Sequence, residues 1–343
     1  MSTNDMDSAS AYDPDTYSLV SQASTMLTIG DSIPAQLVKK TARRGYTFNI
    51  MSVGPPEMNK TTLMSALFGK SLDMSPDGDG SEARTKSEAQ DPYNPPVTIT
   101  KKTFEIEEKR VKLKLTLAES EAYGEALCLQ GTHKPLVDYI DAQFAEYFRR
   151  ESTLNRRQIK DNMVHCLFFF ISPFGYGLSE FDLQFLEAVH TRVNIIPIIA
   201  KAEALTISER IAFKWRVRND LKDRNINIYQ LDSPDLDDSD DCKRVYKDIR
   251  EAMPFAISSM ALQQDSTPAE RCLDWGCINP YDLNHSDFLL LKSMLHMQIP
   301  DLCEMTNEVF YEDYRLAMMK GDPSGITLGQ SHLRSVPKLV GKC

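Results

Sequence analysis

The sequence predicts a three-layer α/β protein built on a doubly wound, largely parallel sheet. Short apolar or alternating runs recur along the chain and favour buried strands: "TFNIMSVG", "VKLKLTLA", "VHCLFFFIS", "VNIIPIIA" and "INIYQL". Between them, apolar residues recur at helical spacing, as in Val137, Ile140, Phe144 and Tyr147. Strands alternating with helices indicate a parallel sheet that is covered on both faces.

Bulk composition excludes several classes of protein. Of 343 residues, 42% are hydrophobic and 26% charged, which is ordinary for a globular chain, and the net charge of -10 disfavours general nucleic-acid binding. No run approaches the roughly 20 apolar residues that span a bilayer, so we expect a cytoplasmic protein. The seven cysteines form no C-x-x-C pair, which predicts reduced thiols rather than disulfides or a zinc site.

The chain divides into five segments. Residues 1–30 are rich in Ser, Asp and Thr and predict a disordered arm. Residues 31–45 carry the basic cluster Lys39, Lys40, Arg43 and Arg44, which is either a solvated helix face or a contact for anionic lipid or an acidic partner. The α/β domain is expected over 46–262, a smaller extension over 263–319, and a flexible tail without coiled coil over 320–343.

The stretch "GPPEMNKTT" lies between a predicted strand and a predicted helix, as a phosphate loop of pattern G-x-x-x-x-G-K-[S/T] does. Gly54, Lys60 and Thr61 fit the pattern, and Asn59 stands at the second glycine. Asn tolerates positive φ, but Glu57 adds a carboxylate near the terminal phosphates, so we expect weakened phosphate binding. A plain strand-to-helix turn remains the alternative. The candidate phosphate-binding residues are Gly54, Glu57, Met58, Asn59, Lys60, Thr61 and Thr62.

A second candidate element is "IIAKAE", at the end of a predicted buried strand. Guanine-binding proteins carry [N/A]-K-x-D there, with Lys along the base and Asp accepting hydrogen bonds from it. Lys201 fits, and Glu203 keeps the charge on a longer side chain. Taken alone, the two residues are equally compatible with an ordinary strand end.

Taken in order, these blocks make the chain resemble the septin family of cytoskeletal GTP-binding proteins, from about Ile33 to Met319. The resemblance also rests on "KKTARRGYTF", "YIDAQFAEYF", "FFFISPFGYGL" and "RCLDWGCINPYDLNHSDFLLLKSML". The last block resembles the septin unique element. The resemblance therefore implies a P-loop GTPase-like core over 46–262 and a septin unique element over 263–319.

The family resemblance implies bound GTP or GDP, with Ser259 and Arg271 near the base, and leaves Mg²⁺ at Thr61 open. It implies other septin subunits as partners in hetero-oligomeric filaments at the cell cortex and in cytokinesis. It further implies phosphoinositide contact by the basic cluster. Expected interface residues are Tyr176, Trp275, His285 and Phe288.

The departures from the family pattern gather in the pocket. Glu119 stands for the metal-side Asp, Ala122 for a glycine, and Pro96 for the threonine of the first switch. Because hydrolysis depends on accurately placed charge and water, it should be weak or absent, while nucleotide binding survives in weaker form. An active septin GTPase is the alternative. Pro280 is expected inside an edge strand, where it would weaken association through the chain termini.

Overall fold

The computed structural model describes residues 46–72, 95–108, 111–152, 159–231, 240–263, 268–274 and 276–320. The expectations for the arm, for the basic cluster Lys39, Lys40, Arg43 and Arg44, for Trp275 and for residues 321–343 lie outside these ranges. The division between 262 and 263 stays a prediction.

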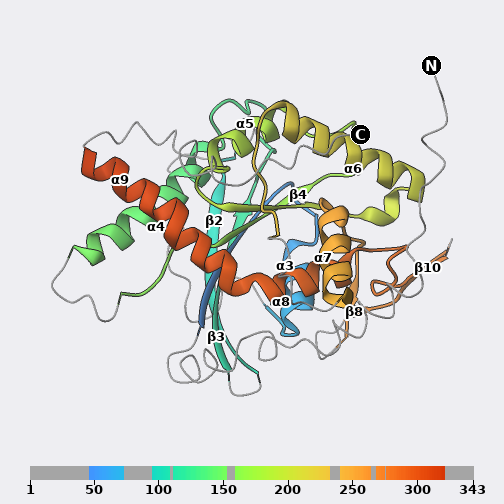
Figure 1. Ribbon diagram of the computed structural model, residues 1–343. Coiled ribbons are helices and arrows are strands. Elements are labelled where there is room, and N and C mark those ends of the chain that lie inside the picture. Colours follow the sequence, from blue (N-terminus) through green and yellow to red (C-terminus); the bar gives the residue numbers. More distant parts are fainter. Residues whose placement is uncertain are drawn as a thin grey trace.

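A six-stranded sheet forms the centre of the molecule, in the order β2-β3-β1-β4-β5-β6 (Figure 1). β1 pairs in parallel with β3 and β4, β5 does so with β4 and β6, and only β2 runs antiparallel, against β3. The mixed but mostly parallel α/β fold is confirmed. The strands are β1 (Tyr46–Val53), β2 (Thr98–Glu108), β3 (Val111–Glu121), β4 (Cys166–Ile171), β5 (Asn194–Ile199) and β6 (Phe255–Ala256).

Helices cover both faces of this sheet because alternate strand residues point to opposite sides. In β1, Phe48 and Ile50 join one buried cluster, whereas Met51 and Val53 join the other. The first cluster is completed by α3 (Lys60–Phe68), α7 (Asp240–Ala252) and α8 (Phe288–Met305). The second is completed by α4 (Lys134–Glu151), α5 (Glu180–Val189) and α6 (Ile207–Asp223).

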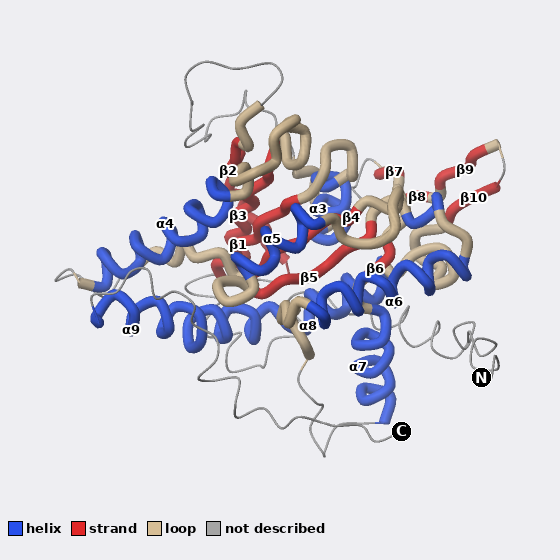
Figure 2. Tube along the Cα trace, turned by 90° about the horizontal axis from the view of Figure 1, so that it is seen from above, coloured by secondary structure: helices blue, strands red, loops and turns tan. Residues whose placement is uncertain are grey.

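The helix α8 continues through a π-helical stretch, η3 (Thr306–Tyr311), into α9 (Glu312–Lys320). Asn194 lies at the start of β5. Its side-chain Nδ2 donates to the Leu302 carbonyl at 3.2 Å and to the Thr306 hydroxyl at 3.3 Å. Figures 1 and 2 show α9 running beside α4. There the Tyr314 ring stacks on Phe144 at 5.5 Å between centroids. The C-terminal helix is thus fixed to the central sheet at its middle and to α4 near its end.

Short elements lie between β5 and α8: the 3-10 turn η2 (Ala202–Ala204), the pair β7 (Ala261–Leu262) and β8 (Pro268–Ala269), and the hairpin of β9 (Arg271–Leu273) and β10 (Gly276–Ile278). Within the described ranges, no helix is long and apolar enough to cross a membrane.

Three expectations differ from the structure. The run "INIYQL" forms no strand; only the Tyr229 amide donates to the Ile195 carbonyl, at 2.9 Å, and β6 pairs with the far end of β5 instead. Pro280 lies buried in a turn after β10, which already ends at Ile278, so it is not part of an edge strand. Cys272 and Cys277 are joined in a disulfide, because the hairpin places them directly opposite each other.

Candidate nucleotide-binding site

The loop from Gly54 to Asn59 joins the end of β1 to the start of α3. Gly54 is required by close packing, since a Cβ there would lie 2.6 Å from Cβ of Phe170 in β4. Glu57 (φ 60°) and Asn59 (φ 54°) adopt left-handed backbone conformations. Asparagine is among the residues that enter this region at low cost, so the loop closes without the second glycine. The helix N-terminus that follows leaves unpaired N-H groups, which suit an anion.

Lys60 is buried beneath this loop. Its Nζ donates to the carbonyls of Gly54 at 3.1 Å and Ser120 at 2.9 Å, so it links the loop to the end of β3. Burial lowers the pKa of Lys60, and the nearby carboxylates, led by Glu119 at 3.9 Å, partly oppose that shift. The lysine therefore already has two protein acceptors in the place where phosphate oxygens would compete for it.

The Thr61 hydroxyl and Glu119 form the metal side of the site. Thr61 Oγ1 donates to Glu119 Oε2 at 2.9 Å. A hydroxyl and a carboxylate are oxygen donors of the kind Mg²⁺ prefers, so this pair fits the ion chemically. Ala122, just after β3, sits at φ 60°, a conformation that costs a residue with a Cβ about 1 kcal/mol. The glycine that the family pattern has here would avoid that strain.

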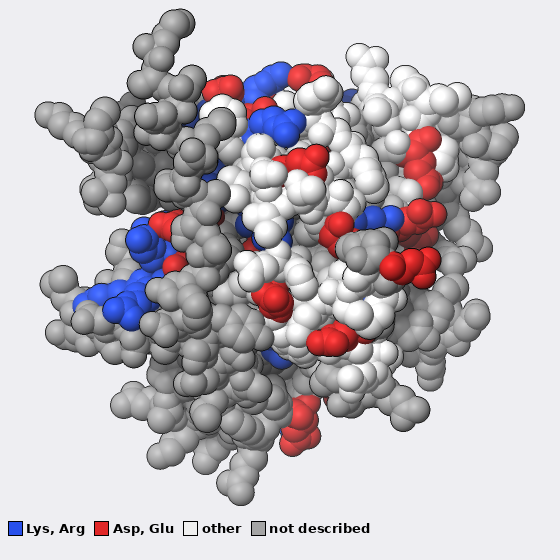
Figure 3. All heavy atoms as spheres, turned by 90° about the vertical axis from the view of Figure 1, so that its right-hand side faces the viewer, with Lys and Arg blue, Asp and Glu red and all other residues white. Residues whose placement is uncertain are grey.

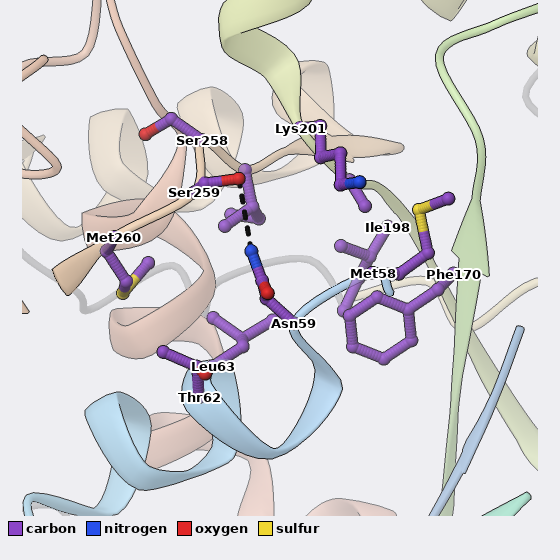
Figure 4. A pocket seen from close by; sticks show the side chains of 12 residues that line it. Met58, Asn59, Thr62, Leu63, Phe170, Ile198, Lys201, Ser258, Ser259 and Met260 are labelled. Carbon is purple, nitrogen blue, oxygen red and sulfur yellow. Dashed lines mark hydrogen bonds between the residues drawn. The ribbon is translucent and has the colours of Figure 1, made fainter. Parts of the chain in front are cut away.

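A pocket opens between the loop, β5 and the segment after β6 (Figure 4). The space between these segments, open solvent included, is about 270 Å³. The Asn59 side chain reaches across it, and its Nδ2 donates to Ser259 Oγ at 3.2 Å. Asn59 consequently makes no side-chain cap on α3, although asparagine is a favoured cap. The lining residues are Met58, Asn59, Thr62, Leu63, Phe170, Ile198, Ala200, Lys201, Ile257, Ser258, Ser259 and Met260.

The base side of the pocket is held together by Glu203. Its Oε2 accepts the Ser259 amide at 2.8 Å, and its Oε1 lies 3.9 Å from Arg271 Nη1. Lys201, in the left-handed conformation at φ 50°, lines the same pocket. The structure thus brings together Lys201, Glu203, Ser259 and Arg271, as the resemblance implies. The carboxylate that would receive guanine hydrogen bonds is turned toward the segment after β6 and toward β9.

The other expected residues fall in different places. Pro96 lies two residues before β2 and is not among the described residues that line the pocket. Tyr176 is 90% exposed, and the Arg216 guanidinium lies 5.8 Å from its ring centroid. His285 accepts the Asn279 amide at 3.2 Å, which orders a turn. Phe288 is fully buried and packs against Tyr281, so its assignment as an interface residue is wrong: it belongs to the core.

Two functional contacts escape sequence reasoning: the Asn59–Ser259 bridge and the Lys60 contact with the Ser120 carbonyl. The first has a signal in the sequence, because the asparagine at the second glycine position of the loop carries a polar side chain that needs a hydrogen-bond partner. The second has none, because a carbonyl acceptor carries no residue identity.

A phosphate loop between strand and helix, with Lys60 beneath it and Lys201 and Glu203 beyond β5, defines a P-loop protein of the GTPase class. A family model described as Septin matches residues 44–326. The chain belongs to the septin family.

Several septins show the relationship directly. Septin-2A of Xenopus laevis is 38% identical over 292 residues, which cover 84% of this chain and 80% of that protein. Septin-1 of Drosophila melanogaster is 35% identical over 302 residues, with 86% and 81% covered. Septin-5 of Mus musculus is 37% identical over 302 residues, with 86% and 79% covered.

Proposed function

We propose that this chain is a guanine-nucleotide-binding septin subunit that hydrolyses GTP weakly or not at all and acts as a scaffold in hetero-oligomeric cytoskeletal filaments. The single observation that carries the proposal is the Asn59–Ser259 hydrogen bond across the pocket. A nucleotide must displace this bridge, and must also compete with Gly54 and Ser120 for Lys60. Binding is therefore weaker than in a pocket with glycine at 59.

Hydrolysis suffers more than binding under this proposal. Thr61 and Glu119 would hold Mg²⁺, which would screen the phosphate charge. The first-switch position is Pro96, which has no hydroxyl, and Ala122 carries a methyl group where a γ-phosphate contact needs glycine. Since a misplacement of about 1 Å costs on the order of 100-fold in rate, these changes remove turnover before they remove binding.

Assembly needs a surface rather than turnover. Tyr176 and Phe174, 90% and 70% exposed, present two aromatic rings from the loop after β4, where aromatic residues favour protein contact. Figure 3 shows the face where β10 lies: uncharged side chains make up much of its described part, interspersed with both acidic and basic side chains. Such a surface suits a protein partner better than nucleic-acid phosphate. We assign the basic cluster to anionic phosphoinositide membranes and the filament to the cytoplasmic cortex.

Single-turnover hydrolysis and co-purification test the proposal together. With the purified chain in excess over GTP and with saturating Mg²⁺, GTP should be hydrolysed at least 100-fold more slowly than by a catalytically competent septin. A comparable rate would instead identify an active septin GTPase. Lys60→Ala should lower affinity for guanine nucleotide, and unchanged affinity would contradict the phosphate loop.

Co-purification with competent septin subunits addresses the scaffold. Tyr176→Ala should reduce recovery of the partner, while Met319→Ala, which removes an exposed apolar side chain on α9, serves as the control. A monomeric chain in the presence of every candidate subunit would refute the scaffold role.

A further inference from the structure

The β9–β10 hairpin carries a disulfide between paired residues. Arg271 lies opposite Ile278, Cys272 opposite Cys277, and Leu273 opposite Gly276, with the two cysteine Cα atoms 4.0 Å apart. Both cysteines are exposed. Figure 2 shows β9 and β10 extending at one end of the molecule, away from the central sheet. Solvent and small solutes therefore reach the sulfur atoms without any opening of the core.

The disulfide acts on the hairpin and little on the rest of the fold. It joins residues only 5 positions apart, and a short loop removes little entropy from the unfolded chain. β9 and β10 pair only with each other among the described strands, and an isolated two-stranded ribbon is marginal in water. The covalent link is thus the strongest element that keeps these two strands together.

We propose that Cys272 and Cys277 form a reversible thiol–disulfide exchange site for small thiols and disulfides of the glutathione type. In a reducing compartment, an exposed disulfide is expected to be redox-active rather than permanent. In oxidation, the Cys272 or Cys277 thiolate attacks one sulfur of glutathione disulfide and releases one glutathione thiol. The second cysteine thiolate then attacks the mixed disulfide and releases the other. Two protein thiols are oxidised, and one disulfide is reduced to two thiols.

The hairpin connects this site to the base side of the pocket. Arg271 directly precedes Cys272, and its guanidinium lies 3.9 Å from Glu203, whose other oxygen accepts the Ser259 amide. Asn279 lies just after β10. Its side-chain Nδ2 donates to Oε1 of Glu270, the residue before Arg271, at 3.1 Å. The oxidised state fixes the strand that presents Arg271, and reduction releases it. The exchange reaction in graded glutathione buffers is independent of the proposed function, whereas the reducing surroundings and this effect on the pocket rest on it.

The test is differential alkylation in graded glutathione buffers. The full chain is equilibrated at increasing ratios of glutathione disulfide to glutathione, quenched in acid, and its thiols are alkylated before and after reduction with reagents of different mass. Peptide mass spectrometry should show Cys272 and Cys277 changing label together, with an intramolecular disulfide as the product. Cys128→Ser, which removes an exposed cysteine outside the hairpin, should leave this transition unchanged. Cys272→Ser should convert the Cys277 product into a mixed disulfide with glutathione.

Three outcomes would overturn the proposal: both cysteines stay alkylatable in the most oxidising buffer, the main oxidised product is intermolecular, or the disulfide persists in the most reducing buffer. Hydrogen exchange supplies a second measurement. Amides of β9 and β10 should exchange at least tenfold more slowly in the oxidised chain, and the double variant Cys272→Ser/Cys277→Ser should show no redox difference. Equal exchange in both redox states of the wild-type chain would refute the local stabilisation.

Discussion

Lys214 in α6 and Asp287 at the start of α8 form a buried ion pair, with 2.5 Å between Nζ and Oδ2. Lys214 also donates to the Ala252 carbonyl at 2.8 Å, and Asp287 accepts the Ala256 amide at 2.7 Å. Burial lowers the pKa of Lys214, and Asp287 opposes that shift. The pair thereby joins α6, the end of α7, β6 and α8 at one point.

Asp287→Ala should lower the free energy of unfolding by about 3 kcal/mol or more, because it leaves a buried ammonium and a backbone amide without their acceptor. Urea unfolding measures the change. Glu180→Ala is the control: it breaks an exposed ion pair with Arg224 and should cost no more than about 1 kcal/mol. Equal losses of unfolding free energy in the two variants would show that the buried ion pair stabilises the fold no more than the exposed one.

Gly54→Ala should destabilise the chain by about 3 kcal/mol, since it adds both backbone strain and a clash with Phe170. Gly69→Ala isolates the strain: φ is 58° and no atom lies within 4 Å of the added Cβ, so the cost should be about 1 kcal/mol. Thermal or urea unfolding of both variants gives the comparison. The close approach of the loop to β4 would be unimportant if Gly54→Ala behaved like Gly69→Ala.

Asn59→Gly should raise the affinity for GDP about tenfold, a gain of about 1.4 kcal/mol, because the bridge to Ser259 no longer has to be broken and the pocket loses a side chain. Titration with a fluorescent GDP analogue measures it. Ser259→Ala removes the acceptor and leaves the asparagine in place, so its gain should be smaller. Affinity that stays the same or falls in Asn59→Gly would mean that the bridge does not oppose binding.

The buried side chain of Tyr139 should make the fold less stable at alkaline pH. Burial raises its pKa to about 12, above the value near 10 of an unfolded tyrosine. Between pH 10 and 12 the unfolded chain releases this proton and the folded chain keeps it, so stability is complete below pH 10 and falls as pH rises. The contribution is up to about 1.4 kcal/mol per pH unit.

Tyr139→Phe should make the fall in the free energy of unfolding shallower than in the wild type over that range, measured by urea unfolding at several pH values. Tyr176→Phe, at a 90% exposed ring, is the matched control and should follow the wild-type slope. If the free energy of unfolding of Tyr139→Phe fell with pH as steeply as that of the wild type, the raised pKa of Tyr139 would be contradicted.

Much of the fold follows from local pattern. The apolar runs around Phe48, Phe168 and Ile196 become central strands because such runs are stable only when both faces are covered. The run at Ile226 looks similar but makes only one backbone contact with β5, at Ile195, while Phe255 and Ala256 pair with the other end of β5. That outcome is decided by tertiary packing, which local pattern does not contain.

The site divides in the same way. Lys60 and Thr61 follow β1 and Lys201 follows β5, so the order of residues places them near one edge of the sheet, because the carboxyl ends of parallel strands meet there. The partners of Asn59 and Glu203 depend on side-chain direction, which the order of residues does not determine. Phe288 shows the opposite error: an aromatic in a family block was assigned to an interface, although its place at the start of α8 buries it.

The continuous helix from Phe288 to Lys320 gives the molecule a mechanical property. At 1.5 Å per residue it is roughly 50 Å long, and it starts beside Lys214 and ends beside α4. Near its middle, the helix accepts hydrogen bonds from the Asn194 side chain at the Leu302 carbonyl and the Thr306 hydroxyl. One helix therefore ties α6, the sheet and α4 together, so two distant surfaces of the subunit share a single support.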